Sequence, residues 1–173
     1  EAMDNQDVTA LLNKYRNYMR SMKSYDRHFD TDLLRHIIEN DLMTADTLKD
    51  KSKLEKVVEN LDEYYKQQEV ETLKKYSFSI EDDQEHGGYL IKVEIRYTMK
   101  TKRFKLNHYF LDSPEFADLL NYWEGIKKYK NADFKIASEK GEPKEFANLK
   151  DFTDFILADG RQGAYIQRYK GLG

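Results

Sequence analysis

The feature that most constrains the fold is a change in the spacing of apolar residues along the chain. From residue 89 to residue 100, every second position is apolar or aromatic, as in a strand with one buried face (Tyr89, Ile91, Val93, Ile95, Tyr97 and Met99). In the first third of the chain, apolar residues instead recur every three or four positions, as in amphipathic helices. The two periods together predict an α+β fold.

The helical period predicts three helices near the start of the chain. The first contains residues 11–22, the second begins at Asp30-Thr31-Asp32, and the third spans about 51–68. Carboxylates such as Asp30 and Asp32 can hold magnesium, but they also accept hydrogen bonds from the free backbone amides at the start of a helix. No third carboxylate is placed beside them by an adjacent motif, so we interpret the pair as a helix cap.

Further strands and helices are expected downstream. They are strands at about 76–80, 104–108 and 134–136, a helix that starts at Ser113-Pro114-Glu115, and a helix opened by Asn148. This order predicts a helical subdomain at 1–69 and an antiparallel sheet with packed helices at 70–162. A return strand and a loop are expected at 163–173.

The composition argues against several classes of protein. The chain contains no cysteine, which excludes disulfides and thiolate metal sites and is compatible with a cytoplasmic protein. No apolar run approaches the roughly 20 residues that cross a bilayer, and the first residues lack the features of a signal peptide, so neither membrane insertion nor export is expected. No serine-nucleophile motif or phosphate-binding glycine loop is visible, which argues against a free-standing hydrolase.

The four histidines show no metal-ligand spacing. His108 could act as a general base, but we favour a hydrogen-bonded histidine at the edge of the sheet.

One segment of the chain is basic. The net charge of −3 gives no overall sign of nucleic-acid binding, but residues 84–108 contain six basic and two acidic residues. The residues that could contact DNA phosphates or an acidic protein surface are Arg96, Lys100, Lys102, Arg103 and Lys105. An alternative interpretation is that lysines at strand edges prevent edge-to-edge aggregation.

The last eight residues form a motif of a different kind, Ile166-Gln167-Arg168-Tyr169-Lys170-Gly171-Leu172-Gly173. As a string, this motif resembles the Q-R-Y/F-K-G-L-G signature of bacterial type IIA topoisomerases, which lies in the TOPRIM region of the gyrase B subunit and of its topoisomerase IV counterpart. The preceding 160 residues correspond in position to a large insertion that many Gram-negative gyrase B subunits carry just upstream of this signature.

The resemblance implies a place near DNA for the end of the chain. Arg168 and Lys170 would lie close to the DNA-cleavage site, and Gly171 and Gly173 would permit close approach of the backbone. The parent subunit uses ATP and Mg²⁺, but this chain lacks the acidic magnesium motifs of the family, so no cofactor, catalytic residue or metal ligand is expected here. The implied partners are the gyrase A subunit, duplex DNA and the rest of the gyrase B subunit.

Two hypotheses of different classes follow. In the first, the chain is a non-catalytic insertion that supports DNA binding and coupling between subunits during ATP-dependent negative supercoiling. In the second, it is an independent nucleic-acid-binding module that uses the basic hairpin at 92–105.

Overall fold

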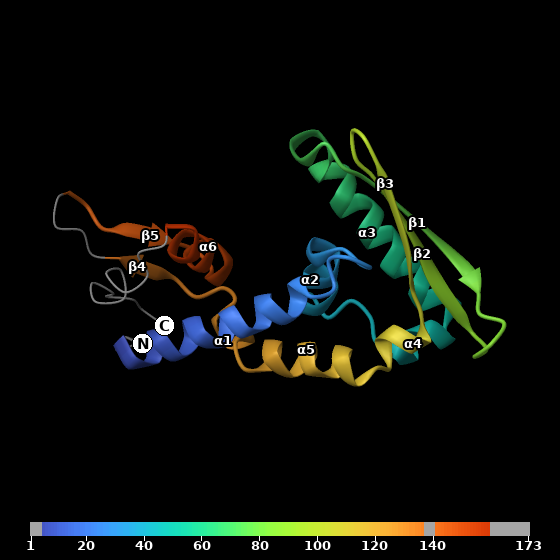
Figure 1. Ribbon diagram of the computed structural model, residues 1–173, viewed down its shortest axis with the longest axis horizontal. Coiled ribbons are helices and arrows are strands. Elements are labelled where there is room, and N and C mark those ends of the chain that lie inside the picture. Colours follow the sequence, from blue (N-terminus) through green and yellow to red (C-terminus); the bar gives the residue numbers. More distant parts are fainter. Residues whose placement is uncertain (1–4, 137–140, 160–173) are drawn as a thin grey trace. The chain divides into compact units, whose positions relative to one another are not determined.

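The computed structural model describes residues 5–136 and 141–159, which form a mixture of helices and antiparallel strands (Figure 1). The elements are α1 (Asn5–Lys23), α2 (Thr31–Glu39), the 3₁₀ helix η1 (Ala45–Lys49), α3 (Lys51–Thr72), β1 (Lys75–Asp82), β2 (Tyr89–Arg96), β3 (Thr101–Leu106), α4 (His108–Leu111), α5 (Pro114–Glu124), the 3₁₀ helix η2 (Lys127–Tyr129), β4 (Phe134–Ile136), β5 (Lys144–Phe146) and α6 (Leu149–Asp159). The predicted α+β class is confirmed.

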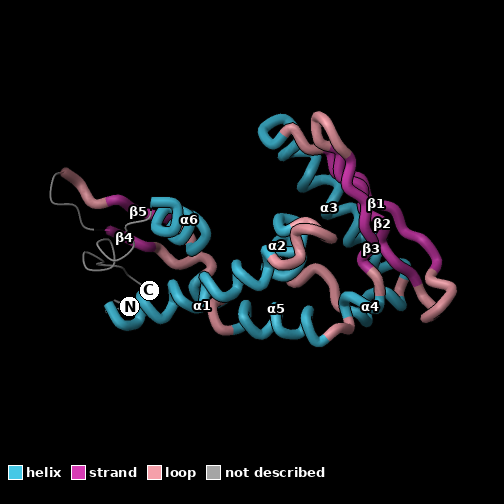
Figure 2. The backbone as a smooth tube through the Cα atoms, viewed as in Figure 1, coloured by secondary structure: helices cyan, strands magenta, loops and turns pink. Residues whose placement is uncertain are grey.

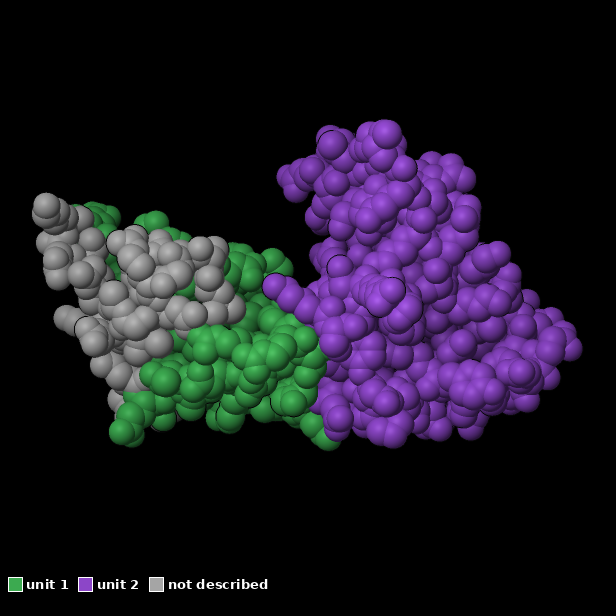
Figure 3. All heavy atoms as spheres, in the orientation of Figure 1, with its two compact units in different colours: residues 1–21, 121–173 green, residues 22–120 purple. Residues whose placement is uncertain are grey.

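The chain divides into two compact units, which Figure 3 colours separately. Unit 1 contains residues 1–21 and 121–173, and unit 2 contains residues 22–120. The boundary that we expected between residues 69 and 70 falls inside unit 2, because α3 packs against β1 immediately after it in the sequence. The expected strand and loop at 163–173 lie outside the described residues.

Unit 2 is built around a three-stranded antiparallel sheet in the order β1-β2-β3, with α3 lying along one face (Figure 2). Ile91, Val93 and Ile95 of β2 are fully buried, as the alternating pattern predicts. Facing them from α3 are buried apolar residues at helical spacing, namely Leu54, Val57, Leu61 and Tyr65. The two periods read from the sequence therefore meet in one core.

An aromatic cluster joins the far end of the sheet to the loop before α2. Phe29 stacks on Phe110 with ring centroids 4.2 Å apart, and it meets the edge of Phe104 at 5.4 Å. Phe110 in turn contacts Phe116, the first buried residue of α5. Such ring pairs stabilise a fold beyond the area that they bury.

Unit 1 has its own smaller core. In α1 and α5, Tyr18 and Trp123 pack with ring centroids 5.7 Å apart. The two-stranded sheet of β4 and β5 lies against α6, where Phe134 and Phe152 stack at 4.3 Å with nearly parallel rings. Asn148 caps α6 by accepting a hydrogen bond from the Asp151 amide, as expected from the sequence.

The structure corrects two predicted strand ends. The strand expected to continue to residue 100 ends at Arg96, because the Tyr97 amide donates to the Lys100 carbonyl and closes a turn. The strand expected to reach His108 ends at Leu106, because the Asn107 side chain accepts a hydrogen bond from the Phe110 amide and starts α4. At both strand ends the alternating pattern continues past the last strand residue, so the sequence alone does not show where the strand stops.

Within residues 5–136 and 141–159, no helix is both long enough and apolar enough to cross a bilayer.

Candidate functional site

The face of the three-stranded sheet that points away from α3 carries a group of cations. We call it the basic face, and its residues are Lys75, Lys92, Arg96, Arg103 and Lys105, all exposed. The antiparallel register brings them together, since Lys75 lies opposite Arg96 and Lys92 lies opposite Lys105. Side chains at every second position of a strand share one face, so the pleat that buries Ile91 and Val93 exposes these cations.

Glu94 lies in the middle of the basic face and organises its two arginines. Its two carboxylate oxygens accept hydrogen bonds from Arg96 Nε at 2.9 Å and from Arg103 Nε at 3.1 Å. These bonds hold the pKa of Glu94 below its usual range. The pairs fix the positions of both guanidinium groups and offset part of their charge.

Two lysines of the basic face lie directly opposite each other. Lys92 on β2 and Lys105 on β3 are cross-strand neighbours, an arrangement in which like charges repel. Lys92 also approaches Glu81 of β1, with 3.9 Å between nitrogen and oxygen. A juxtaposed pair of ammonium groups costs folding stability but provides a local positive potential that an anionic partner would relieve.

Two of the five residues predicted from the sequence lie elsewhere. Lys102 is on the opposite face of β3, beside Ile95 in the register, and donates a hydrogen bond to the Asp26 backbone carbonyl. Lys100 is in the turn after β2, with its nitrogen 5.0 Å from the centre of the Tyr97 ring. Lys102 therefore has a structural partner, and Lys100 belongs to the end of the sheet instead of its face.

The structure adds two residues that the sequence analysis did not select. Lys75 and Lys92 share the basic face with Arg96, Arg103 and Lys105. Counting back in steps of two from Arg96 would have found Lys92, but Lys75 becomes a neighbour only through the pairing of β1 with β2.

The comparison with protein families decides what kind of chain this is. A family model described as the DNA gyrase B subunit insert domain matches residues 1–137. The chain belongs to this family. Within the described residues, the matched segment runs from α1 to β4 and includes the entire basic face.

The end of the chain lies beyond the insert-domain match. β5 and α6 follow residue 137, as does the signature motif. The motif residues predicted to lie near DNA, Arg168, Lys170, Gly171 and Gly173, are outside the described residues. Their proximity to DNA stays a prediction that rests on the resemblance of the motif.

Within the acidic pair of the insert domain, Asp30 has the capping role expected for it. Asp30 is 3% exposed, and its carboxylate accepts hydrogen bonds from the Leu33 amide at 3.1 Å and from the Tyr76 hydroxyl at 2.6 Å. Asp32 lies in the first turn of α2. Across the described ranges, no group of three or more histidines and acidic residues is arranged to hold a metal ion.

Two of the four histidines of the insert domain lie against each other. His86 and His108 stack with ring centroids 4.8 Å apart, and each has its own carboxylate, Asp83 at 3.2 Å and Asp112 at 3.5 Å. His108 is on α4, not on the sheet edge as expected, because the strand ends earlier. The ring of Tyr109 meets that of His86 edge-on, with ring centroids 4.4 Å apart.

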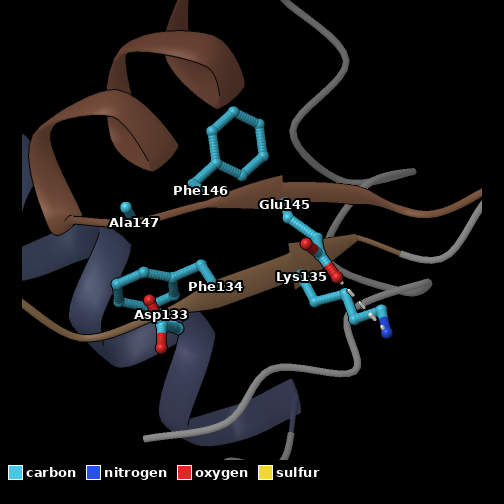
Figure 4. A pocket seen from close by; sticks show the side chains of 6 residues that line it. All are labelled: Asp133, Phe134, Lys135, Glu145, Phe146 and Ala147. Carbon is cyan, nitrogen blue, oxygen red and sulfur yellow. Dashed lines mark ion pairs between the residues drawn. The ribbon is translucent and has the colours of Figure 1, made fainter.

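A hollow of about 380 Å³ lies on the hairpin of β4 and β5 (Figure 4). Its lining includes the ion pair of Lys135 with Glu145, at 3.6 Å. Phe134 and Phe146 belong to the phenylalanine cluster that packs against α6. Its other described lining residues are Asp133 and Ala147, and the lining residues that the structure describes include neither histidine nor a hydroxyl side chain.

Proposed function

We propose that this insert domain is a non-catalytic part of the gyrase B subunit that supports DNA binding and coupling between subunits during ATP-dependent negative supercoiling of DNA. The basic face, in a chain of the gyrase B insert family, is the observation that carries the proposal. The enzyme to which gyrase B subunits belong is a type II DNA topoisomerase.

The chemistry of the basic face suits contact with phosphate. Two arginines held by Glu94 present guanidinium groups without losing much rotamer freedom on binding, and three lysines add mobile charges around them. Such contacts are independent of base sequence, which matches an enzyme that must act at many places on DNA.

Catalysis is assigned to other parts of the parent protein. ATP and Mg²⁺ would be held by the other segments of the gyrase B subunit, in a cytoplasmic enzyme. The segment that contains Arg168 and Lys170 would connect the insert to the DNA-cleavage region. The gyrase A subunit and the rest of gyrase B would be its protein partners.

Excision of the insert tests the proposal. A gyrase B subunit from which residues 1–137 have been removed should keep DNA-independent ATP hydrolysis but lose most of its DNA affinity and supercoiling activity when combined with gyrase A. A second variant, Lys92→Glu with Lys105→Glu, should lower DNA affinity without excision, because it reverses two exposed charges. Lys53→Glu, a single charge reversal at an exposed residue of α3, is the control. Full supercoiling by the excised enzyme would refute the supporting role.

The second candidate is an independent nucleic-acid-binding module, and the same cations favour it. A titration of the isolated chain with a duplex of about 20 base pairs at low salt separates the two. Binding by the chain alone, lost in Arg103→Ala with Lys105→Ala, would favour the module. Lys102 is a poor choice for this test, because its bond to the Asp26 carbonyl makes it structural.

A further inference from the structure

Exposed apolar side chains gather at one end of unit 2. Val70 is 85% exposed, Leu73 72% and Met99 92%, and these are the three most exposed large apolar residues in the part of the chain that the structure describes. Val70 and Leu73 are at the end of α3, and Met99 is in the turn between β2 and β3. Figure 1 shows these two segments at the same end of the sheet.

A shared hollow and two contacts between an amine and a ring link four residues at that end. Leu73 and Tyr97 line one shallow hollow of about 270 Å³. The amines of Lys74 and Lys100 lie 5.2 Å and 5.0 Å from the centre of the Tyr97 ring. We call this surface the α3-end patch, and it consists of Val70, Leu73, Lys74, Tyr97, Met99 and Lys100.

The backbone of Leu73 is in a conformation that leucine avoids. Its φ of 56° places it in the left-handed region, where helices normally end in glycine. A leucine held there costs about 1 kcal/mol relative to glycine and in this case buries little of its side chain in return. A conformational cost borne by a solvent-exposed apolar residue is a reason to look for a contact outside the chain.

The exposed apolar side chains of the patch favour a protein partner over duplex DNA. Around them, the hollow beside Tyr97 is lined by Lys74, Lys75 and Arg96 as well as by Glu69, so the surroundings of the patch are mainly basic and attract acidic groups. Apolar side chains such as Leu73 and Met99 gain little from the phosphate and sugar surface of a duplex. A protein segment with one or two apolar side chains flanked by carboxylates matches both the apolar centre and the two lysines over Tyr97.

We propose that the α3-end patch docks a partner protein segment that presents apolar side chains between acidic ones. This inference rests on the proposed function and deepens it, because it names the surface through which the insert would reach its protein neighbours. In this proposal, DNA binds to the basic face of the sheet, and a protein segment binds at the end of the same sheet. Burial of Leu73 and Met99 supplies affinity, and Lys74 and Lys100 supply orientation.

Direct binding measurements on the full 173-residue chain test the patch. The probes are purified gyrase A subunit, gyrase B lacking residues 1–137, and a 20-base-pair duplex, each titrated separately against the immobilised chain. Leu73→Gly is the central variant, because glycine suits the left-handed backbone and the variant should fold at least as well as the parent. Met99→Ser removes the second apolar group from an exposed turn, and Tyr122→Ser, at a 39% exposed residue elsewhere, is the control.

We expect one of the two protein probes to bind and the double variant Leu73→Gly, Met99→Ser to bind it about 10-fold or more weakly. Tyr122→Ser should leave that affinity unchanged. Lys100→Glu should also weaken it, with an effect that shrinks at high salt, whereas Lys53→Glu should not.

Other outcomes overturn the proposal. Protein binding that the patch variants leave intact, or absence of binding to both protein probes, removes the docking role. Duplex binding that is lost in Met99→Ser and Lys100→Glu would make the patch a nucleic-acid contact instead. Each of these results leaves the supporting role of the whole insert open, since that role fails only if excision leaves supercoiling unaffected.

Discussion

Tyr65 and Tyr76 stack face to face with ring centroids 3.8 Å apart, but their hydroxyl groups have different surroundings. The Tyr76 hydroxyl donates to the carboxylate of Asp30 at 2.6 Å. The Tyr65 hydroxyl is buried and has no hydrogen-bond partner among the described residues. Burial raises the pKa of both phenols well above the usual value, so both stay protonated at any ordinary pH.

This difference predicts unequal effects of the same substitution on the free energy of unfolding. Tyr76→Phe leaves the buried Asp30 carboxylate short of a donor and should lower the free energy of unfolding by about 1–3 kcal/mol. Tyr65→Phe removes an unpaired polar atom and should change it by less than about 0.5 kcal/mol, or raise it. Urea denaturation of the two variants checks this, and equal losses would contradict the assignment of the hydrogen bonds.

Asp26 predicts a dependence of stability on pH. Partial burial raises the pKa of this carboxyl, but the amide and hydroxyl of Thr31 donate to it and Lys102 lies nearby, so the net pKa is lowered. A lowered pKa means that the stabilisation is complete above the unfolded value, near pH 4, and is lost as pH falls through the folded value below it.

Denaturation at pH 7 and at pH 3 measures this effect. The parent chain should lose more stability on acidification than Asp26→Asn, which cannot titrate. At pH 7, the free energy of unfolding of Thr31→Ala should lie between those of the parent and Asp26→Asn, because this variant loses the hydroxyl donor to Asp26 but keeps the amide donor. If the parent and Asp26→Asn lost equal stability between pH 7 and pH 3, the acid sensitivity would come from other carboxyl groups.

Local and distant contacts at these residues differ in how far the sequence predicts them. Asp30 as a cap of α2 follows from its place before an apolar helical repeat, and the structure confirms it. The bond from Tyr76 to Asp30 joins residues 46 positions apart and depends on how α3 and the sheet pack. No spacing rule contains that information.

The turn between β1 and β2 contains two glycines, and the helix η1 packs against one of them. Gly87 and Gly88 both have positive φ values, 71° and 77°. A Cβ on Gly88 would lie 2.7 Å from the backbone oxygen of Leu48 in η1, whereas a Cβ on Gly87 would meet nothing within 4 Å. The turn therefore needs glycine for conformation at both positions and for space at only one.

The two alanine variants should separate these costs. Gly87→Ala should destabilise the chain by about 1 kcal/mol through conformation alone. Gly88→Ala should cost clearly more, because rigid backbone blocks the added methyl group and η1 must shift. Thermal denaturation of both variants gives the comparison, and a smaller loss for Gly88→Ala would show that η1 moves freely.

At the scale of elements, periodic segments were predictable and most short ones were not, although the three-residue strand β4 was expected at 134–136. The alternation at 89–96 and the helical repeats at 33–38 and 54–65 correspond to β2, α2 and α3. The 3₁₀ helix η1 and the strand β5 are too short to show a period, and the sequence analysis did not predict them. The turn at 97–100 was missed because Tyr97 and Met99 continue the strand pattern into a loop.

At the scale of the whole molecule, a net charge of −3 accompanies a basic face with five exposed cations. Acidic residues elsewhere weaken the attraction of DNA, so the isolated chain should bind a duplex measurably only well below physiological salt. The logarithm of the binding constant should fall with the logarithm of salt concentration with a slope of about −3 to −5, and Lys105→Ala should reduce that slope by about 1. Fluorescence anisotropy at several salt concentrations tests this, with Lys53→Ala as the control.

The candidate site was only partly predictable, because strand pairing across the whole sheet decides which cations share a face. Clustering in sequence selected Lys100 and Lys102, but the pleat of the sheet sends Lys102 to the other face. Pairing with β1 brought in Lys75, whose position depends on strand order. Sequence shows where charge accumulates, and strand pairing decides which charges share a surface.

Residues 5–21 and 121–136 belong to the same compact unit, although 99 residues of unit 2 separate them. The core of unit 1 can therefore close only after both of its segments have been made, with all of unit 2 between them.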